Sequence, residues 1–154
     1  QLAGLLVAVG AAVTAPSNFL GGYVSDRLRS PLLVVGSALA VLAVTTSALA
    51  VVSGTAALLA VVAVNSFFIQ VYFGPLFAVP VELLGPRTAG MTTGFGNFFA
   101  NLGGFTFSYL LGAIKDATGS FSPGLHVLSG LCLVALLCTF ALARLKQASL
   151  PPAA

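Results

Sequence analysis

Six uncharged polar side chains within otherwise apolar runs could recognise a small solute. An amide or a phenol can hydrogen-bond a carboxylate or a hydroxyl without the desolvation cost of a buried charge. The alternative for each side chain is a hydrogen bond between helices, worth about 0.6 kcal/mol. The structural role fits any single residue slightly better, whereas the whole set favours a contribution to a cavity. These residues are Asn65, Gln70, Tyr72, Asn97 and Asn101, with Asn18 as a weaker sixth member.

A few charged residues stand at the ends of apolar runs. Asp26 is followed by Arg27, and a carboxylate at a helix end can pair with a helix N-terminus or with basic groups elsewhere. Glu82 and Arg87 flank a Gly-Pro break and could pair with each other or with the surroundings of Asp26. The alternative for each is an interfacial charge that fixes the orientation of the chain. Because Glu82 lies at the end of its run, it fits a proton carrier less well.

The sequence lacks the residue patterns of an enzyme or a metal site. It shows no Ser/His, Cys/His or paired-carboxylate constellation within its apolar runs. Cys132 and Cys138 lie in one run, where they cannot bridge within a helix, and their spacing fits no metal site. His126, the single histidine, stands at the start of that run. We therefore expect no catalytic residue, no cofactor and no metal.

The elements that must position these side chains are membrane-spanning helices. Apolar residues make up 58% of the 154 residues and charged residues only 6%, which excludes a soluble enzyme, a disordered tail and a nucleic-acid-binding domain. A spanning helix needs about 20 apolar residues, and the stretches between the charges fit that length. The sequence predicts an all-α polytopic bundle with five spans, at about 2–22, 32–52, 56–83, 89–113 and 124–144, and a short tail at 147–154.

The basic residues predict how these spans are oriented. Five spans place the loops alternately on the two sides of the membrane, and cytoplasmic loops carry an excess of Lys and Arg. Of the six Lys and Arg residues, one side of the predicted topology holds only Lys115. We therefore expect the N-terminus outside and the C-terminus in the cytoplasm of a plasma (inner) membrane. The other side carries Arg27, Arg29, Arg87, Arg144 and Lys146.

Small residues in the fourth predicted span form a stripe. Spacings of three and four place them, with two of the asparagines, on one helical face that admits another helix closely or lines a wet cavity. The second and fifth spans contain no Asn or Gln, so we expect them to be outer, lipid-facing helices. The glycines to which we assign helix packing are Gly90, Gly94, Gly103 and Gly104.

Several motifs resemble those of the major facilitator superfamily. The segment Gly22-Tyr-Val-Ser-Asp26-Arg27 resembles its loop motif G-x-L-a-D-r-x-G-r-k, and the segment from Glu82 to Gly94 resembles its junction between the tenth and eleventh helices. The pattern continues through Gly103-Gly104 and covers about residues 15–145. The chain departs from it at Arg29-Ser30-Pro31, where the family has Gly and two basic residues.

The resemblance implies a fold and a function. It implies helices eight to twelve of a twelve-helix transporter with two halves, so that the N-terminal half and helix seven are missing. It implies secondary transport of a small solute by alternating access, with gating by Gly22, Asp26, Arg27, Glu82 and Arg87. The helix-eleven region is similar to organic-anion symporters, which implies an organic anion and a coupling ion as partners, besides the lipid bilayer. The alternative is a truncated, non-transporting membrane protein that packs with other helices through its Gly-rich fourth span.

Overall fold

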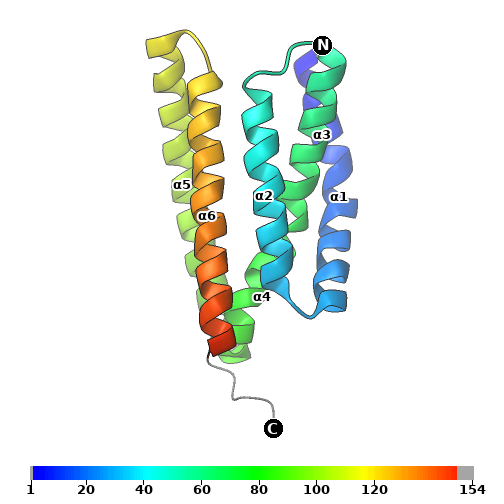
Figure 1. Cartoon of the computed structure of the whole chain (residues 1–154), viewed down its shortest axis with the longest axis vertical. Coiled ribbons are helices and arrows are strands. Elements are labelled where there is room, and N and C mark those ends of the chain that lie inside the picture. Colours follow the sequence, from blue (N-terminus) through cyan, green and yellow to red (C-terminus); the bar gives the residue numbers. More distant parts are fainter. Residues whose placement is uncertain (1, 149–154) are drawn as a thin grey trace.

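The computed structural model describes residues 2–148, and every regular element within them is helical (Figure 1). The predicted all-α class is therefore confirmed. Consecutive long helices run antiparallel and are joined by short turns. The elements are α1 (Leu2–Leu28), α2 (Pro31–Leu49), α3 (Thr55–Val71), α4 (Phe73–Leu84), the short 3-10 helix η1 (Pro86–Thr88), α5 (Ala89–Thr118) and α6 (Ser122–Ala148).

Three helical stretches of the described chain are long and apolar enough to cross a membrane: Pro31–Leu49, Thr55–Leu84 and Ser122–Lys146. Helices α1 and α5 have 27 and 30 residues, which exceeds the length that a bilayer requires. Helix α5 carries Gly, Asn, Ser and Thr at many positions, and these residues lower its hydropathy. The five-span count stays a prediction for α1 and α5.

The turns between helices use residues suited to unusual backbone angles. Gly54, Gly85 and Gly119 have φ values of 105°, 87° and 74°, where a side chain would be strained. Pro31 and Pro86 occupy the first positions of α2 and η1, where a missing N–H costs nothing. The chain therefore reverses at the breaks that the sequence pattern indicates, although α1 continues to Leu28 rather than ending at residue 22.

Helix α2 lies at the centre of the bundle and packs against α1, α3, α4 and α6. This contradicts our expectation that the second span is an outer, lipid-facing helix. Lipid tails and helix interiors are equally apolar, so hydropathy does not separate a central helix from a peripheral one. The buried side chains of α2 include Leu32, Val34, Val35, Ala38, Leu42, Ala43 and Thr46.

Helix α5 lies at the edge of the bundle. It contacts α4, η1 and α6, and none of its side chains is buried. Helix α6 packs mainly against α2 and leaves another face open, where Val134 and Leu137 are exposed. The bundle therefore has a packed centre around α2 and an open side along α5.

The two ends of the bundle differ in charge. The α1–α2 turn, the α4–α5 junction and the end of α6 all lie at the lower end in Figure 1, and the α5–α6 turn lies at the upper end. The lower end therefore gathers the basic residues that we assigned to one side, and Lys115 stands at the opposite end. Which end faces the cytoplasm stays a prediction.

Candidate solute-binding site

The closest approach between helices in the candidate site joins α1 to the end of α3. A Cβ atom added to Gly21 would lie 2.0 Å from the backbone oxygen of Val71, a distance that no real side chain tolerates. Pro75, which is fully buried, has no N–H to donate to that oxygen, the normal acceptor four residues earlier. The missing side chain of Gly21 therefore lets α1 cover a carbonyl group that Pro75 leaves without its usual helical partner.

Small residues on α1 make this contact possible along most of the helix. Thr14 and Ser17 turn their hydroxyl groups back to the carbonyls of Gly10 and Val13. Ser17 is completely buried, and the Oγ of Ser66 would lie 3.3 Å from a Cβ at Gly10. Spacings of four and three place these residues on one face of α1. Our sequence reasoning missed this stripe because it attended to the glycines of α5, although the same periodicity was visible here.

An amide pair crosses the seam between α1 and α3. Asn18 Nδ2 donates to Gln70 Oε1 at 3.3 Å. Asn18 is exposed and Gln70 is half-buried, so the pair is open to whatever fills the space beside the seam. At 1.5 Å per residue, Asn18 lies about 15 Å from the end of α1, close to the middle of a hydrocarbon core about 30 Å thick. The structure therefore brings together two of the six predicted polar residues.

A helix break stands beside the amide pair. Tyr72 separates α3 from α4, is half-buried, and has its ring centroid 6.4 Å from that of Phe73. The stretch that we predicted as one span at 56–83 stays one helical stretch, Thr55–Leu84, and is interrupted only at Tyr72, whose φ of −82° and ψ of −14° are still right-handed. A proline in a membrane helix leaves one carbonyl without its usual partner and bends the axis, and interrupted helices recur at solute sites in transporters. Tyr72 and the Asn18–Gln70 pair form the candidate site.

Asn65 has a different environment. Its side-chain Nδ2 donates to the hydroxyls of Thr45 at 2.9 Å and Thr46 at 3.1 Å, both on α2. Because an amide NH2 group has two hydrogens, these two bonds engage it fully. Asn65 therefore ties α3 to α2, which is the structural alternative that the sequence left open.

Asn97 and Asn101 lie apart from the other amides. Both are exposed on α5, and Asn101 Nδ2 donates to the backbone oxygen of Asn97 at 2.8 Å. Among the described residues, α5 makes no contact with α1, α2 or α3. The predicted polar set is therefore divided among a seam pair with Tyr72, a structural tie and an exposed face.

The glycines of α5 leave an open surface. A Cβ atom on Gly90, Gly94, Gly103 or Gly104 would meet no atom within 4 Å. No described helix of this chain packs on these glycines. The helix-packing role that we assigned to them from the sequence would therefore need a helix outside residues 2–148.

The predicted gating residues lie at the basic end of the bundle. Asp26 and Arg27 are exposed in the last turn of α1, and Gly22 has open space around its Cα. Within residues 2–148 no ion pair involves Asp26.

Glu82 pairs with a residue that the sequence analysis did not select. Its Oε1 lies 2.7 Å from Lys146 Nζ, whereas Arg87 is exposed in η1. Glu82 therefore pairs with Lys146 in this structure, a partner that was not among the alternatives left open by the sequence. The bundle brings the end of α6 next to the end of α4, a contact that residue spacing does not reveal.

Cysteine and histidine residues add no metal site to this region. The described part of the chain contains no group of three His, Cys, Asp or Glu side chains that could hold a metal ion. Cys132 is half-buried and Cys138 is exposed, and both are free thiols.

An antiparallel bundle of long apolar helices defines the class of this chain as an integral membrane protein. A model described as "Major Facilitator Superfamily" matches residues 1–153, and the chain belongs to this superfamily.

Two relatives are similar to part of the chain. Both are from Agrobacterium vitis and carry the description "Putative tartrate transporter"; they are 40% and 39% identical to this chain over 70 residues. The matched segment is 46% of this chain and 16% of each relative, so the similarity covers a small part of those proteins. No solved structure matches the chain significantly.

Proposed function

We propose that this chain supplies five helices to the C-terminal half of a transporter that moves a small organic anion by alternating access. Membership of the major facilitator superfamily points to a transporter rather than an enzyme. The description of the two relatives as tartrate transporters agrees with the organic-anion type. In this proposal the five helices correspond to helices eight to twelve, and the N-terminal half completes the transporter.

The observation that carries the proposal is the Asn18–Gln70 pair beside the break at Tyr72. The pair uses one N–H of Asn18 and the oxygen of Gln70, which leaves the NH2 group of Gln70 for a ligand. Neutral N–H donors suit a carboxylate or a hydroxyl, and tartrate carries both groups. In this proposal the site lies near the midplane, about which the two halves of such a transporter rock.

The charges of an anion transporter must then come from beyond these helices. Residues 30–81 contain no Asp, Glu, Lys or Arg, and the stretches 88–114 and 117–143 are also free of them. Isolated charges within a membrane mark ion and substrate pathways. We therefore assign the cationic partner of the solute and the coupling ion site to the N-terminal half.

Uptake of radiolabelled tartrate by cells that express the whole transporter tests this proposal. We expect Gln70→Leu and Asn18→Leu each to raise KM or lower uptake about 10- to 100-fold, the loss of a hydrogen bond to a charged group. Thr106→Val is the matched control, because Thr106 is exposed on α5 and bonds only to the Leu102 carbonyl of its own helix. Normal uptake by both amide variants would reject the site.

The open glycine face of α5 favours one competing function, a non-transporting protein that docks helices of other membrane proteins. The mass of the native product separates the two readings. An antibody to the C-terminal tail should detect a product about three times the 15.5 kDa of this chain if the transporter reading holds. A native product of 15.5 kDa would favour the docking function instead.

A further inference from the structure

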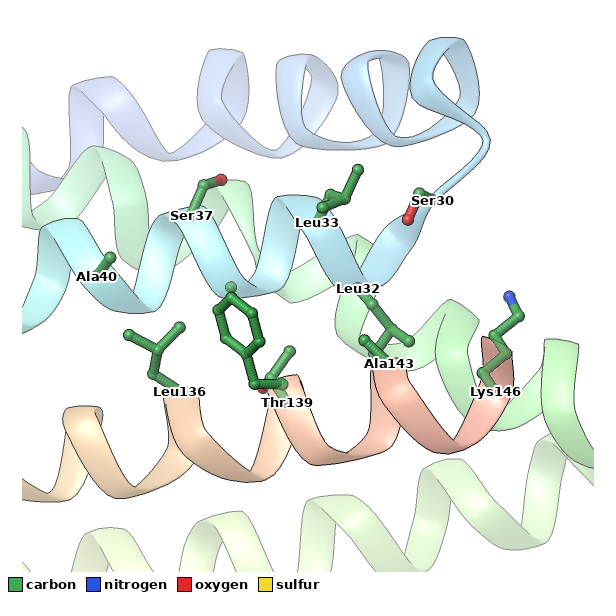
Figure 2. Close-up of a pocket in the computed structure, with 11 residues that line it drawn as sticks. Ser30, Leu32, Leu33, Ser37, Ala40, Leu136, Thr139, Ala143 and Lys146 are labelled. Atoms are coloured by element: carbon green, nitrogen blue, oxygen red, sulfur yellow. The ribbon is translucent and has the colours of Figure 1, made fainter. Parts of the chain in front are cut away.

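A groove runs along the seam between α2 and α6 at the basic end of the bundle (Figure 2). Its volume of about 510 Å³ is within the usual range for sites that hold small molecules. It is separate from the Asn18–Gln70 pair, which lies between α1 and α3. The lining includes Leu33, Gly36, Ala40, Leu136, Phe140 and Ala143.

The walls of the groove present carbon, even where the sequence places hydroxyl groups. Ser37 donates to the Val34 carbonyl at 3.0 Å, and Thr139 donates to the Ala135 carbonyl at 2.9 Å. Both hydroxyls are therefore satisfied by their own helices. At Gly36 the two helices come close, because a Cβ there would lie 3.7 Å from Leu136 Cδ1. The groove suits a hydrocarbon chain.

One end of the groove is polar and cationic. Ser30 and Lys146 line that end, and Figure 2 shows the Lys146 ammonium group beyond Ala143, at the opposite end from Ala40 and Leu136. The neighbouring Arg29 and Arg144 are exposed. Lys146 also binds Glu82, and the last turn of α1 adds Asp26 and Arg27, so two acidic groups stand among four basic ones at this end. The local excess of positive charge favours an anionic headgroup.

The length of the groove matches one leaflet. From Ser30 to Ala40, α2 rises about 15 Å, which is half of a hydrocarbon core about 30 Å thick. A groove with a cationic end at the headgroup level and apolar walls toward the midplane is complementary to an amphiphile with an anionic head and a hydrocarbon chain. Beyond Ala40 the seam continues as a second apolar hollow of about 560 Å³, lined by residues that include Val44, Val51 and Leu133. The feature that favours a lipid over a docked helix is therefore the cation at one end, because an apolar helix gives no reason for it.

We propose that this groove binds one anionic phospholipid, with an acyl chain along the α2–α6 seam and its phosphate beside Lys146. The bundle would then prefer anionic over zwitterionic phospholipids at this groove. This preference does not depend on the proposed solute site.

Fluorescence quenching by brominated lipids tests the proposal in the 154-residue chain, whose sequence contains no Trp. Phe140→Trp places an indole in the groove wall. In phosphatidylcholine vesicles with a minor fraction of brominated lipid, we expect about fivefold stronger apparent binding of brominated phosphatidylglycerol than of brominated phosphatidylcholine. The control Val134→Trp is exposed on α6 outside the groove, and both lipids should quench it equally.

Two further variants separate the Lys146 charge from its ion pair with Glu82. Lys146→Gln should remove most of the preference for phosphatidylglycerol. Glu82→Gln breaks the same ion pair but keeps the cation, so the preference should stay or increase.

Equal quenching of Phe140→Trp by both lipids would overturn the proposal. The proposal would also be overturned if neither lipid quenched the indole and two copies of the chain could be crosslinked through the groove. Native mass spectrometry of the unsubstituted chain gives a second readout, in which co-purified phosphatidylglycerol should exceed phosphatidylcholine.

Discussion

At the scale of single residues, Gly21 makes the tightest contact of the glycines that the structure describes. Its missing side chain lets α1 cover the backbone oxygen of Val71, whose usual partner is absent because residue 75 is Pro. The Cα hydrogens of Gly21 then offer weak Cα–H···O contacts to this carbonyl. The neighbouring Gly22 has no such requirement, since a Cβ there would meet nothing within 4 Å.

This contrast gives a stability prediction with an internal control. Gly21→Ala should destabilise the bundle by about 1–3 kcal/mol or more, because the clash is with backbone and α1 must move away. Gly22→Ala, on the same helix, should leave stability close to that of the unsubstituted chain. Thermal unfolding of the purified protein in detergent measures both, and equal melting temperatures for the two variants would contradict this account of the seam.

A second prediction concerns the tie between α2 and α3. Asn65→Ala removes two hydrogen bonds to Thr45 and Thr46, and should cost about 1 kcal/mol at the 0.6 kcal/mol typical of membrane proteins. The matched control is Asn101→Ala, whose side chain bonds only to a carbonyl of its own helix. The same unfolding assay compares them. An Asn65→Ala variant as stable as the control would show that the tie contributes nothing.

The types of these residues could be predicted from the sequence, but their partners could not. Apolar runs made Asn18, Asn65 and Gln70 stand out, and only the packing of helices showed that Asn18 meets Gln70 while Asn65 meets two threonines. Lys146 was visible as an interfacial charge, yet its pairing with Glu82 depends on how the ends of α4 and α6 meet. Partners distant in sequence follow from tertiary structure, not from spacing.

At the scale of elements, the division between α3 and α4 positions the candidate site. Pro75 removes one backbone N–H donor just after Tyr72. The helical hydrogen bonds resume one residue later, where the Leu76 N–H donates to the Tyr72 oxygen at 2.8 Å. The sequence predicted a bend from Gly74-Pro75 and Pro80. It did not locate the break at Tyr72, because prolines disturb the helical turn before them by an amount that depends on packing.

Changing this proline tests the role of the break. Pro75→Ala supplies an N–H for the Val71 oxygen, so α3 and α4 should join into a straighter helix. Spin labels near Thr55 and Leu84 should move apart in the variant, and uptake should fall because a straighter helix would change the positions of Gln70 and Tyr72. Unchanged label distances would show that packing, rather than Pro75, sets the break.

The helical type of the elements followed from charge-free runs, whereas their neighbours in the bundle did not. Helix α2 contains no Asn or Gln and was expected to face lipid, yet it is the central helix. Its Ala38 and Ala43 are small residues that let neighbouring helices approach, a signal we did not weigh.

At the scale of the whole molecule, the charge difference between the two ends predicts orientation. The end that carries Arg27, Arg29 and Arg144 should face the cytoplasm, and the α5–α6 turn should face outward. In a background without Cys132 and Cys138, a membrane-impermeant maleimide should label Ser120→Cys in intact cells. Leu84→Cys, exposed at the other end, should react only after permeabilisation. The reverse pattern would invert the topology.

The most direct test of the central claim is whether water and solute reach the α1–α3 seam. Thr14→Cys, one turn from Asn18 on α1, leaves the Asn18–Gln70 pair intact. In the whole transporter without other reactive cysteines, we predict that a water-soluble thiol reagent modifies this position and that tartrate slows the reaction. Val44→Cys, exposed on the apolar face of α2, should stay unmodified. Two results would contradict a solute site at Asn18 and Gln70. In the first, Thr14→Cys does not react with the thiol reagent; in the second, it reacts equally fast with and without saturating transported solute.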